Sequence, residues 1–172
     1  MKEHLKKETD KIKGLRLRAA GRASHLFWLG FGEIISIIRR GGAEEVPEFA
    51  LHIQCAWRLS NGSKIQVASR NFYSPRSNWK EEDEDFDWDV PRNNRFDEQI
   101  TAFLKTTAEN LFVKEVETDI LGGLTIFLSE NYVLEVFPDS SDESENDEFW
   151  RLFNRRRNRP HFVVSGNGVE YN

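Results

Sequence analysis

Short apolar runs separated by turn residues fill the segment from Gly123 to Gly168, and they constrain the fold more than any other feature of the chain. Residues 124–128 and 132–137 are strand-like runs on either side of a Ser-Glu-Asn turn, and a third run at 162–164 is followed by Ser-Gly-Asn-Gly. Such runs of β-branched and aromatic residues can bury an apolar face only by pairing with a neighbouring strand. The sequence therefore predicts β-hairpins in this part of the chain.

The N-terminal half contains further strand signals. Aromatic residues and glycines follow one another at 26–32, which favours a strand because both residue types sit badly in helix interiors. Residues 49–59 place apolar side chains at every second position, which predicts one half-buried strand. Asn61-Gly62 then predicts a tight hairpin turn.

One amphipathic helix is predicted after Arg95, with Asp97 as its N-cap. Its apolar positions recur at spacings of three and four and include Ile100, Phe103, Leu104 and Leu111. No other long amphipathic segment is present to cover a sheet. The predicted fold class is therefore α+β, a curved antiparallel sheet built from hairpins with one main amphipathic helix packed on it.

The chain of 172 residues has the length of one domain. Residues 1–13 alternate Lys and Glu with few apolar positions, so we expect a solvated N-terminal segment at 1–13 and a single α+β domain at 14–172. The single cysteine, Cys55, excludes an internal disulfide. Together with the lack of a long apolar run, it favours a cytoplasmic protein without a membrane span.

Residues that could carry catalysis or bind a metal are scattered along the chain. His52 and Cys55 are three positions apart, and on one extended strand such an offset points to opposite faces. Cys55, between Ile53 and Trp57, is typical of a small buried hydrophobe, and His161 is the only histidine expected on another strand. We therefore expect no catalytic residue, no metal site, no cofactor and no enzymatic activity. A hydrolase with an unrecognised carboxylate site is one alternative.

The region between Phe72 and Arg95 predicts a long loop with a dense acidic run that contains two aromatic residues, Phe86 and Trp88. Loops of this length are usually functional or disordered. Aromatic rings inside a negative rim can bind a basic protein surface, unless they fold back onto the core. The predicted partner-binding residues are Asp85, Phe86, Asp87, Trp88 and Asp89.

A second segment, from Trp150 to Arg159, combines aromatic residues with arginines. Such residues can contact RNA phosphates and stack on bases, so a nucleic-acid-associated accessory protein is the alternative function. The net charge of −5 and the acidic residues before this segment favour arginines that pair within the chain. Nucleic acid is therefore not the expected partner.

Short aromatic phrases along the chain resemble a known group of proteins. They are Phe31-Gly32, residues 51–58, Asp87-Trp88-Asp89, residues 134–141, and residues 150–153 with 161–164. In these phrases residues 15–168 resemble small bacterial domains, some grouped with the WapI-type immunity proteins that neutralise polymorphic or contact-dependent toxins. The resemblance implies a non-enzymatic protein whose partner is a basic toxin domain. It supplies no catalytic motif and no partner-binding residue to transfer.

Overall fold

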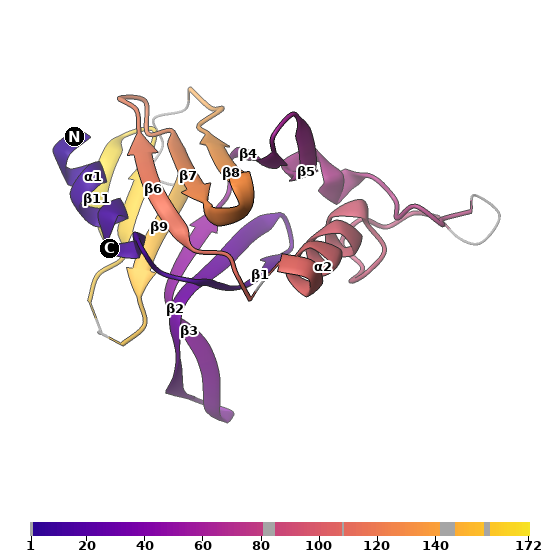
Figure 1. Cartoon of the computed structure of the whole chain (residues 1–172), viewed down its shortest axis with the longest axis horizontal. Coiled ribbons are helices and arrows are strands. Elements are labelled where there is room, and N and C mark those ends of the chain that lie inside the picture. Colours follow the sequence, from indigo (N-terminus) through magenta and orange to yellow (C-terminus); the bar gives the residue numbers. More distant parts are fainter. Residues whose placement is uncertain (1, 81–84, 108, 142–146, 157–158) are drawn as a thin grey trace.

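The protein is described by a computed structural model that covers residues 2–80, 85–107, 109–141, 147–156 and 159–172. Within these residues, eleven strands form two antiparallel sheets, accompanied by two α-helices and three 3-10 turns (Figure 1). The predicted α+β class is confirmed, with two sheets in place of the single sheet that we expected.

The first sheet has six strands in the order β1-β2-β3-β9-β10-β11. These strands are β1 (Leu17–Ala23), β2 (Leu26–Arg39), β3 (Gly42–Ile53), β9 (Glu148–Asn154), β10 (Phe162–Ser165) and β11 (Gly168–Tyr171). The second sheet has five strands in the order β5-β4-β8-β7-β6. They are β4 (Ala56–Asn61), β5 (Lys64–Ala68), β6 (Val113–Thr118), β7 (Leu124–Leu128) and β8 (Tyr132–Phe137).

The predicted hairpins are present where turn residues marked them. Asn61 and Lys64 are partners across the β4–β5 turn, in which Gly62 takes a positive φ of 57°. β7 pairs with β8 across η3 (Ser129–Asn131). The strand predicted at 26–32 is the first half of β2. Local turn chemistry therefore identified these strand pairs correctly.

The strand predicted at 49–59 is two strands that belong to different sheets. β3 ends at Ile53 and β4 begins at Ala56, so the chain crosses between the sheets through Gln54 and Cys55. The apolar alternation continues across the break because Ile53 and Trp57 are both buried in the common core. The prediction of one continuous strand was wrong, since periodicity does not show which neighbour a strand pairs with.

An aromatic cluster joins the two sheets to the main helix, α2 (Arg95–Thr107). The rings of Phe27 on β2 and Trp57 on β4 stack with centroids 4.0 Å apart. Phe96 of α2 meets both rings edge-on, and Phe72 of η2 (Ser69–Tyr73) lies 4.6 Å from Phe96. This cluster fixes α2 against the core, next to β1 and β5, the edge strands of the two sheets.

The helix differs from its prediction at its end. α2 ends at Thr107, so Leu111 is buried in the core from outside the helix. Phe96, Ile100 and Phe103 form the buried face, whereas Leu104 is only half-buried. The apolar face is therefore real, although it is shorter than the pattern suggested.

The N-terminal segment is also only partly as expected. α1 (Lys2–Thr9) and η1 (Asp10–Ile12) expose most of their charged residues, but Glu8 and Thr9 are buried, and Leu5 and Ile12 are buried in the core. A seven-residue spacing places Leu5 and Ile12 on one stripe of a helical segment, and this stripe packs against the body. The expectation that residues 1–13 are solvated was wrong for this stripe.

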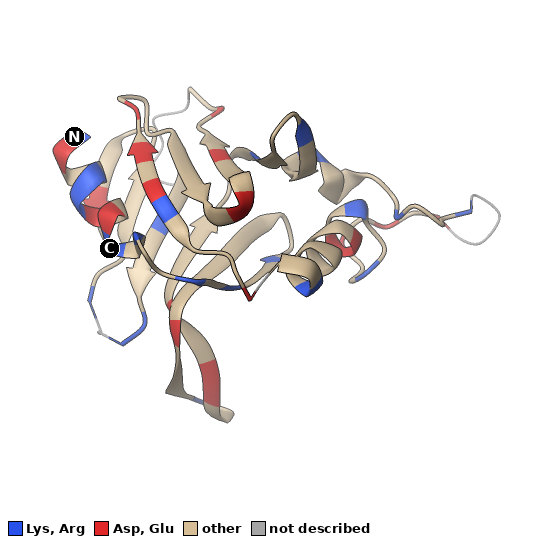
Figure 2. Ribbon diagram, viewed as in Figure 1, with Lys and Arg blue, Asp and Glu red and all other residues tan. Residues whose placement is uncertain are grey.

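Charged residues of both signs are spread over the strands and both helices, as Figure 2 shows. None of the described helices is long and apolar enough to cross a bilayer.

Candidate functional site

The predicted partner-binding residues lie on a long loop between η2 and α2, at the right of Figure 1. Its two limbs run side by side: Pro75 forms an isolated bridge with Asn94, and the Arg76 N–H donates to the carbonyl of Asn93 at 2.9 Å. Further out, the rings of Trp79 and Phe86 meet with centroids 5.7 Å apart. Residues 81–84 lie outside the described residues. We call residues 74–80 and 85–94 the acidic loop.

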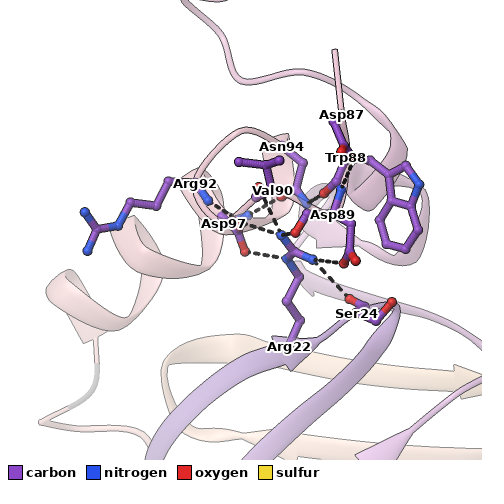
Figure 3. Close-up of polar contacts among 9 residues, drawn as sticks. All are labelled: Arg22, Ser24, Asp87, Trp88, Asp89, Val90, Arg92, Asn94 and Asp97. Carbon is purple, nitrogen blue, oxygen red and sulfur yellow. Dashed lines mark hydrogen bonds and ion pairs between the residues drawn. The ribbon is translucent and has the colours of Figure 1, made fainter. Parts of the chain in front are cut away.

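Arg22 of β1 fixes the base of the acidic loop to α2 (Figure 3). Its Nε and Nη2 donate to the two carboxylate oxygens of Asp97, at 2.9 and 3.0 Å. Its N–H groups also donate to the Asp89 carboxylate at 3.2 Å and to the carbonyls of Ser24, Asp89 and Val90 at 3.2–3.3 Å. Only 7% of the Arg22 side chain is exposed. Asp97 and then Asp89 raise the pKa of the guanidinium, which stays charged.

Asn94 caps α2 and holds the loop at the same time. Its Oδ1 accepts the backbone N–H of Asp97 at 2.8 Å, and its Nδ2 donates to the carbonyl of Trp88 at 2.8 Å. The side chain is completely buried. Asn94 is therefore the N-cap, and the prediction of Asp97 in that role was wrong. Asp97 lies one turn inside the helix, where its carboxylate accepts from Arg22 and from the Arg92 N–H.

The structure separates the five predicted residues into two groups. Asp89 ion-pairs with Arg22, and Trp88 packs against the core with its ring 5.1 Å from Tyr73. These two residues belong to the base of the loop.

The other three residues lie further out. Asp85 and Asp87 are exposed, and the Asp89 N–H donates to the Oδ1 of Asp87 at 2.9 Å. Phe86 is half-buried against Trp79, whose ring also lies under the Arg76 guanidinium at 5.8 Å. The outer part of the loop thus combines two solvated carboxylates with a pair of supported aromatic rings.

Sequence reasoning did not identify Arg22 or Asn94 as residues that position this loop. Asn94 carried a signal, because an Asn three residues before Asp97 fits an N-cap that bonds the N3 backbone. Arg22 carried none, because its partners lie up to 75 positions away in the sequence.

In the segment from Trp150 to Arg159, the tryptophan and two of the arginines make contacts within the protein. Trp150 is completely buried and donates its Nε1–H to the carbonyl of Gly122 at 2.8 Å. Arg151 pairs with Glu148, and Arg156 pairs with Glu33 and Glu48. Trp150 therefore offers no ring face for a base. Residues 157–158 lie outside the described residues.

The positions of His52, Cys55 and His161 differ from those that the sequence predicted. The prediction that His52 and Cys55 lie on one extended strand was wrong, because Cys55 lies after the end of β3, in the crossing between the sheets. His52 meets the ring of Phe153 edge-on at 5.0 Å, and His161 stacks on the same ring at 3.9 Å. Burial raises the pKa of the Cys55 thiol to about 12, so the thiol is protonated at neutral pH.

Among the described residues, no group of three His, Cys, Asp or Glu side chains is placed to hold a metal ion. No family model matches the sequence, and neither a curated protein nor a solved structure matches it.

Proposed function

We propose that the protein is a non-enzymatic protein-binding domain that binds a basic partner through the outer part of the acidic loop. The resemblance of its aromatic phrases to immunity proteins supports a toxin domain as that partner. The proposal rests on one observation: the base of the loop is fixed by Arg22 and Asn94, whereas Asp85 and Asp87 point their charge into solvent.

Fixing the base of the loop lowers the entropy that is lost on binding. A loop that is already ordered through buried hydrogen bonds loses little conformational freedom when a partner contacts its outer part. Two solvated carboxylates next to one another attract a basic surface and raise the association rate. The carboxylate of Asp89 lies 3.2 Å from the Arg22 guanidinium, which offsets part of its charge, so it contributes less to this field.

The packing of the two rings supports Phe86 as the ring that contacts the proposed partner. Phe86 lies on Trp79 at the outer part of the loop, so it can be covered by a partner without unfolding the base. Trp88 packs on Tyr73 and on the core, so we assign it a supporting role. In this proposal Asp85 and Asp87 accelerate association, and Phe86 slows dissociation.

The nucleic-acid alternative has less support. Its central aromatic residue, Trp150, is buried, and Arg151 and Arg156 already pair with carboxylates within the chain.

The experiment begins with the capture of the partner on immobilised protein from cells that carry the neighbouring genes. Association and dissociation rates are then measured for Asp85→Lys/Asp87→Lys and for Phe86→Ala. We expect the charge reversal to slow association about tenfold and to flatten its salt dependence. We expect Phe86→Ala to speed dissociation about tenfold or more.

The matched control reverses two exposed carboxylates elsewhere, Glu109→Lys/Glu117→Lys, and changes the net charge equally. Association with this variant should stay close to that of the wild type. A captured partner that binds all three variants alike would show that the interface lies elsewhere on the protein.

A further inference from the structure

The outer halves of β2 and β3 form a two-stranded arm, residues 33–47, that projects from the body in Figure 1. β1 pairs with β2 only as far as Phe31, and β9 pairs with β3 only from Phe49 onward. In the described part of the chain, no third strand pairs with the arm. The tip of the arm is open, since a Cβ atom added to Gly41 or Gly42 would meet no other atom within 4 Å. Isolated two-stranded ribbons are marginally stable in water, and free strand edges attract further strands.

The β2 strand of the arm is apolar although it lies outside the core. Ile34 is 48% exposed and Ile38 is 90% exposed, while Ile35 and Ile37 are half-buried. None of the four belongs to the core cluster. A concentration of exposed isoleucines on a free strand edge is typical of an interaction surface.

We propose that this edge is a homodimer interface, in which the β2 strands of two copies pair antiparallel about a two-fold axis at Ser36. Residues 33–39 read Glu-Ile-Ile-Ser-Ile-Ile-Arg, which is symmetric about the serine. In this register Ile34 lies opposite Ile38 of the second copy, and Ile35 lies opposite Ile37. Glu33 lies opposite Arg39, so apolar residues face apolar residues and opposite charges face each other.

The backbone N–H and C=O groups of β2 point in the direction that this pairing requires. Ile34 is the partner of Pro47, which has no N–H, so this is a pair that does not exchange hydrogen bonds within the arm. Because the two kinds of pair alternate along an antiparallel ladder, Ser36 and Ile38 are in the same class as Ile34. These three residues direct their N–H and C=O groups at the free edge, where pairing about Ser36 would satisfy them.

The opposite edge of the arm is unsuited to the same contact. Arg155 lies along it, with its N–H donating to the Glu48 carbonyl at 2.7 Å and its Nη1 to the Pro47 carbonyl at 2.8 Å. Self-pairing of β3 would also bring Glu44 and Glu45 of the two copies together, which like charges oppose. The β2 edge is therefore the favoured one, because Arg155 already occupies the β3 edge and because self-pairing of β3 would bring like charges together.

The charged residues at the two ends of the β2 edge can exchange their partners within the chain for partners in a second copy. Arg39 pairs with Glu44 at 3.2 Å while 59% and 50% of the two side chains are exposed, and Glu33, which pairs with Arg156, is 79% exposed. Exposed pairs of this kind contribute little to stability, so a partner charge in the second copy can replace them.

The first test measures the molar mass of the full chain by sedimentation over a range of concentrations, and compares Ser36→Pro with Glu45→Pro. Ser36 and Glu45 face each other in the arm, in a pair that does not exchange hydrogen bonds, so proline at either position keeps the β2–β3 ladder. Only Ser36→Pro removes an N–H from the β2 edge. We expect the wild type and Glu45→Pro to dimerise and Ser36→Pro to be a monomer.

The second test exchanges the charges. Arg39→Glu alone places like charges opposite each other and should weaken the dimer at least about tenfold, whereas Glu33→Arg/Arg39→Glu should restore it. Restoration by the double variant distinguishes pairing between copies from damage to the arm.

Ser36→Cys adds a covalent readout, because a pair that exchanges hydrogen bonds places its Cα atoms about 5.5 Å apart, within the range for a disulfide. Mild oxidation should therefore cross-link two copies. The native Cys55 should contribute little, since its thiol is mostly buried and protonated. A wild type that stays monomeric at every concentration, or a dimer that survives Ser36→Pro, would overturn the proposal. None of these three tests requires the loop's partner, so failure here leaves the proposed function open.

Discussion

Arg22 and Asp97 lie 75 positions apart in the sequence and form a two-point ion pair, in which Nε and Nη2 of the arginine donate to both carboxylate oxygens. The side chains are 7% and 17% exposed, so the pair is shielded from water. Arg22→Lys should destabilise the protein by about 2–3 kcal/mol, because an ammonium group cannot reproduce the planar fork and leaves carbonyl and carboxylate oxygens unsatisfied. Urea unfolding measures this change.

The control for this prediction is Arg58→Lys. Arg58 makes the same two-point contact with Glu135, at 2.5 and 2.8 Å, but its side chain is 45% exposed. Water can replace the lost contact there, so we expect a clearly smaller effect. Equal losses at the two sites would mean that shielding of Arg22 contributes nothing.

Asn94→Ala should destabilise α2 and release the acidic loop together. The substitution removes the side-chain oxygen that caps α2 by accepting the Asp97 N–H, and it also removes the donor to the Trp88 carbonyl. Loss of the cap alone should cost about 1–2 kcal/mol of stability. Hydrogen exchange should become faster at residues 85–94 as well as in the first turn of α2. The neighbouring Asn93→Ala, which changes a side chain with no such capping role, should leave both regions protected. Faster exchange in the helix alone would contradict a link between cap and loop.

Phe103→Ala should cost about 3–5 kcal/mol of unfolding free energy, because it empties a buried aromatic site. Phe103 is 7% exposed and packs edge-on against Tyr132 of β8, with centroids 5.1 Å apart. Chemical denaturation of this variant is compared with Thr101→Ala, which changes an exposed position of the same helix. An unchanged midpoint for Phe103→Ala would show that this face of α2 points to solvent.

His52 should make stability depend on pH in the weakly acidic range. Burial, followed by the charges of Arg155 and Arg151, lowers its pKa from 6.5 to about 4. The unfolded chain therefore takes up this proton at a higher pH than the folded protein does. The contribution of His52 is fully present above pH 6.5 and is lost as the pH falls through about 4.

The measurement is the urea midpoint between pH 7 and pH 4 for the wild type and for His52→Gln. The variant should lose part of the decline in this range. His25→Gln, in the exposed turn between β1 and β2, is the matched control for removal of a histidine. A decline of the same steepness in the wild type and in His52→Gln would show that another group causes it.

Local signals predicted the parts of the fold that depend on few neighbouring residues. Turn chemistry and side-chain periodicity act over a few positions. They therefore predicted the turn at Asn61-Gly62, the β7–β8 hairpin and the apolar face around Ile100 and Phe103. The same signals located the acidic loop, since acidic residues without periodicity do not form a strand or a helix. They also established the α+β class.

Tertiary structure decided which of these elements meet. The crossing at Gln54 and Cys55 sends Trp57 into the second sheet, where it stacks on Phe27 of the first, and no local pattern marks such a change of partner. Likewise, the sequence alone showed Asp89 and Asp97 as two of many acidic residues, whereas the fold places Arg22 against both of them and buries most of the Asp97 side chain. Residue type and spacing determine what a segment can form. Long-range strand pairing and burial determine which side chains are neutralised in the interior and which remain available at the surface.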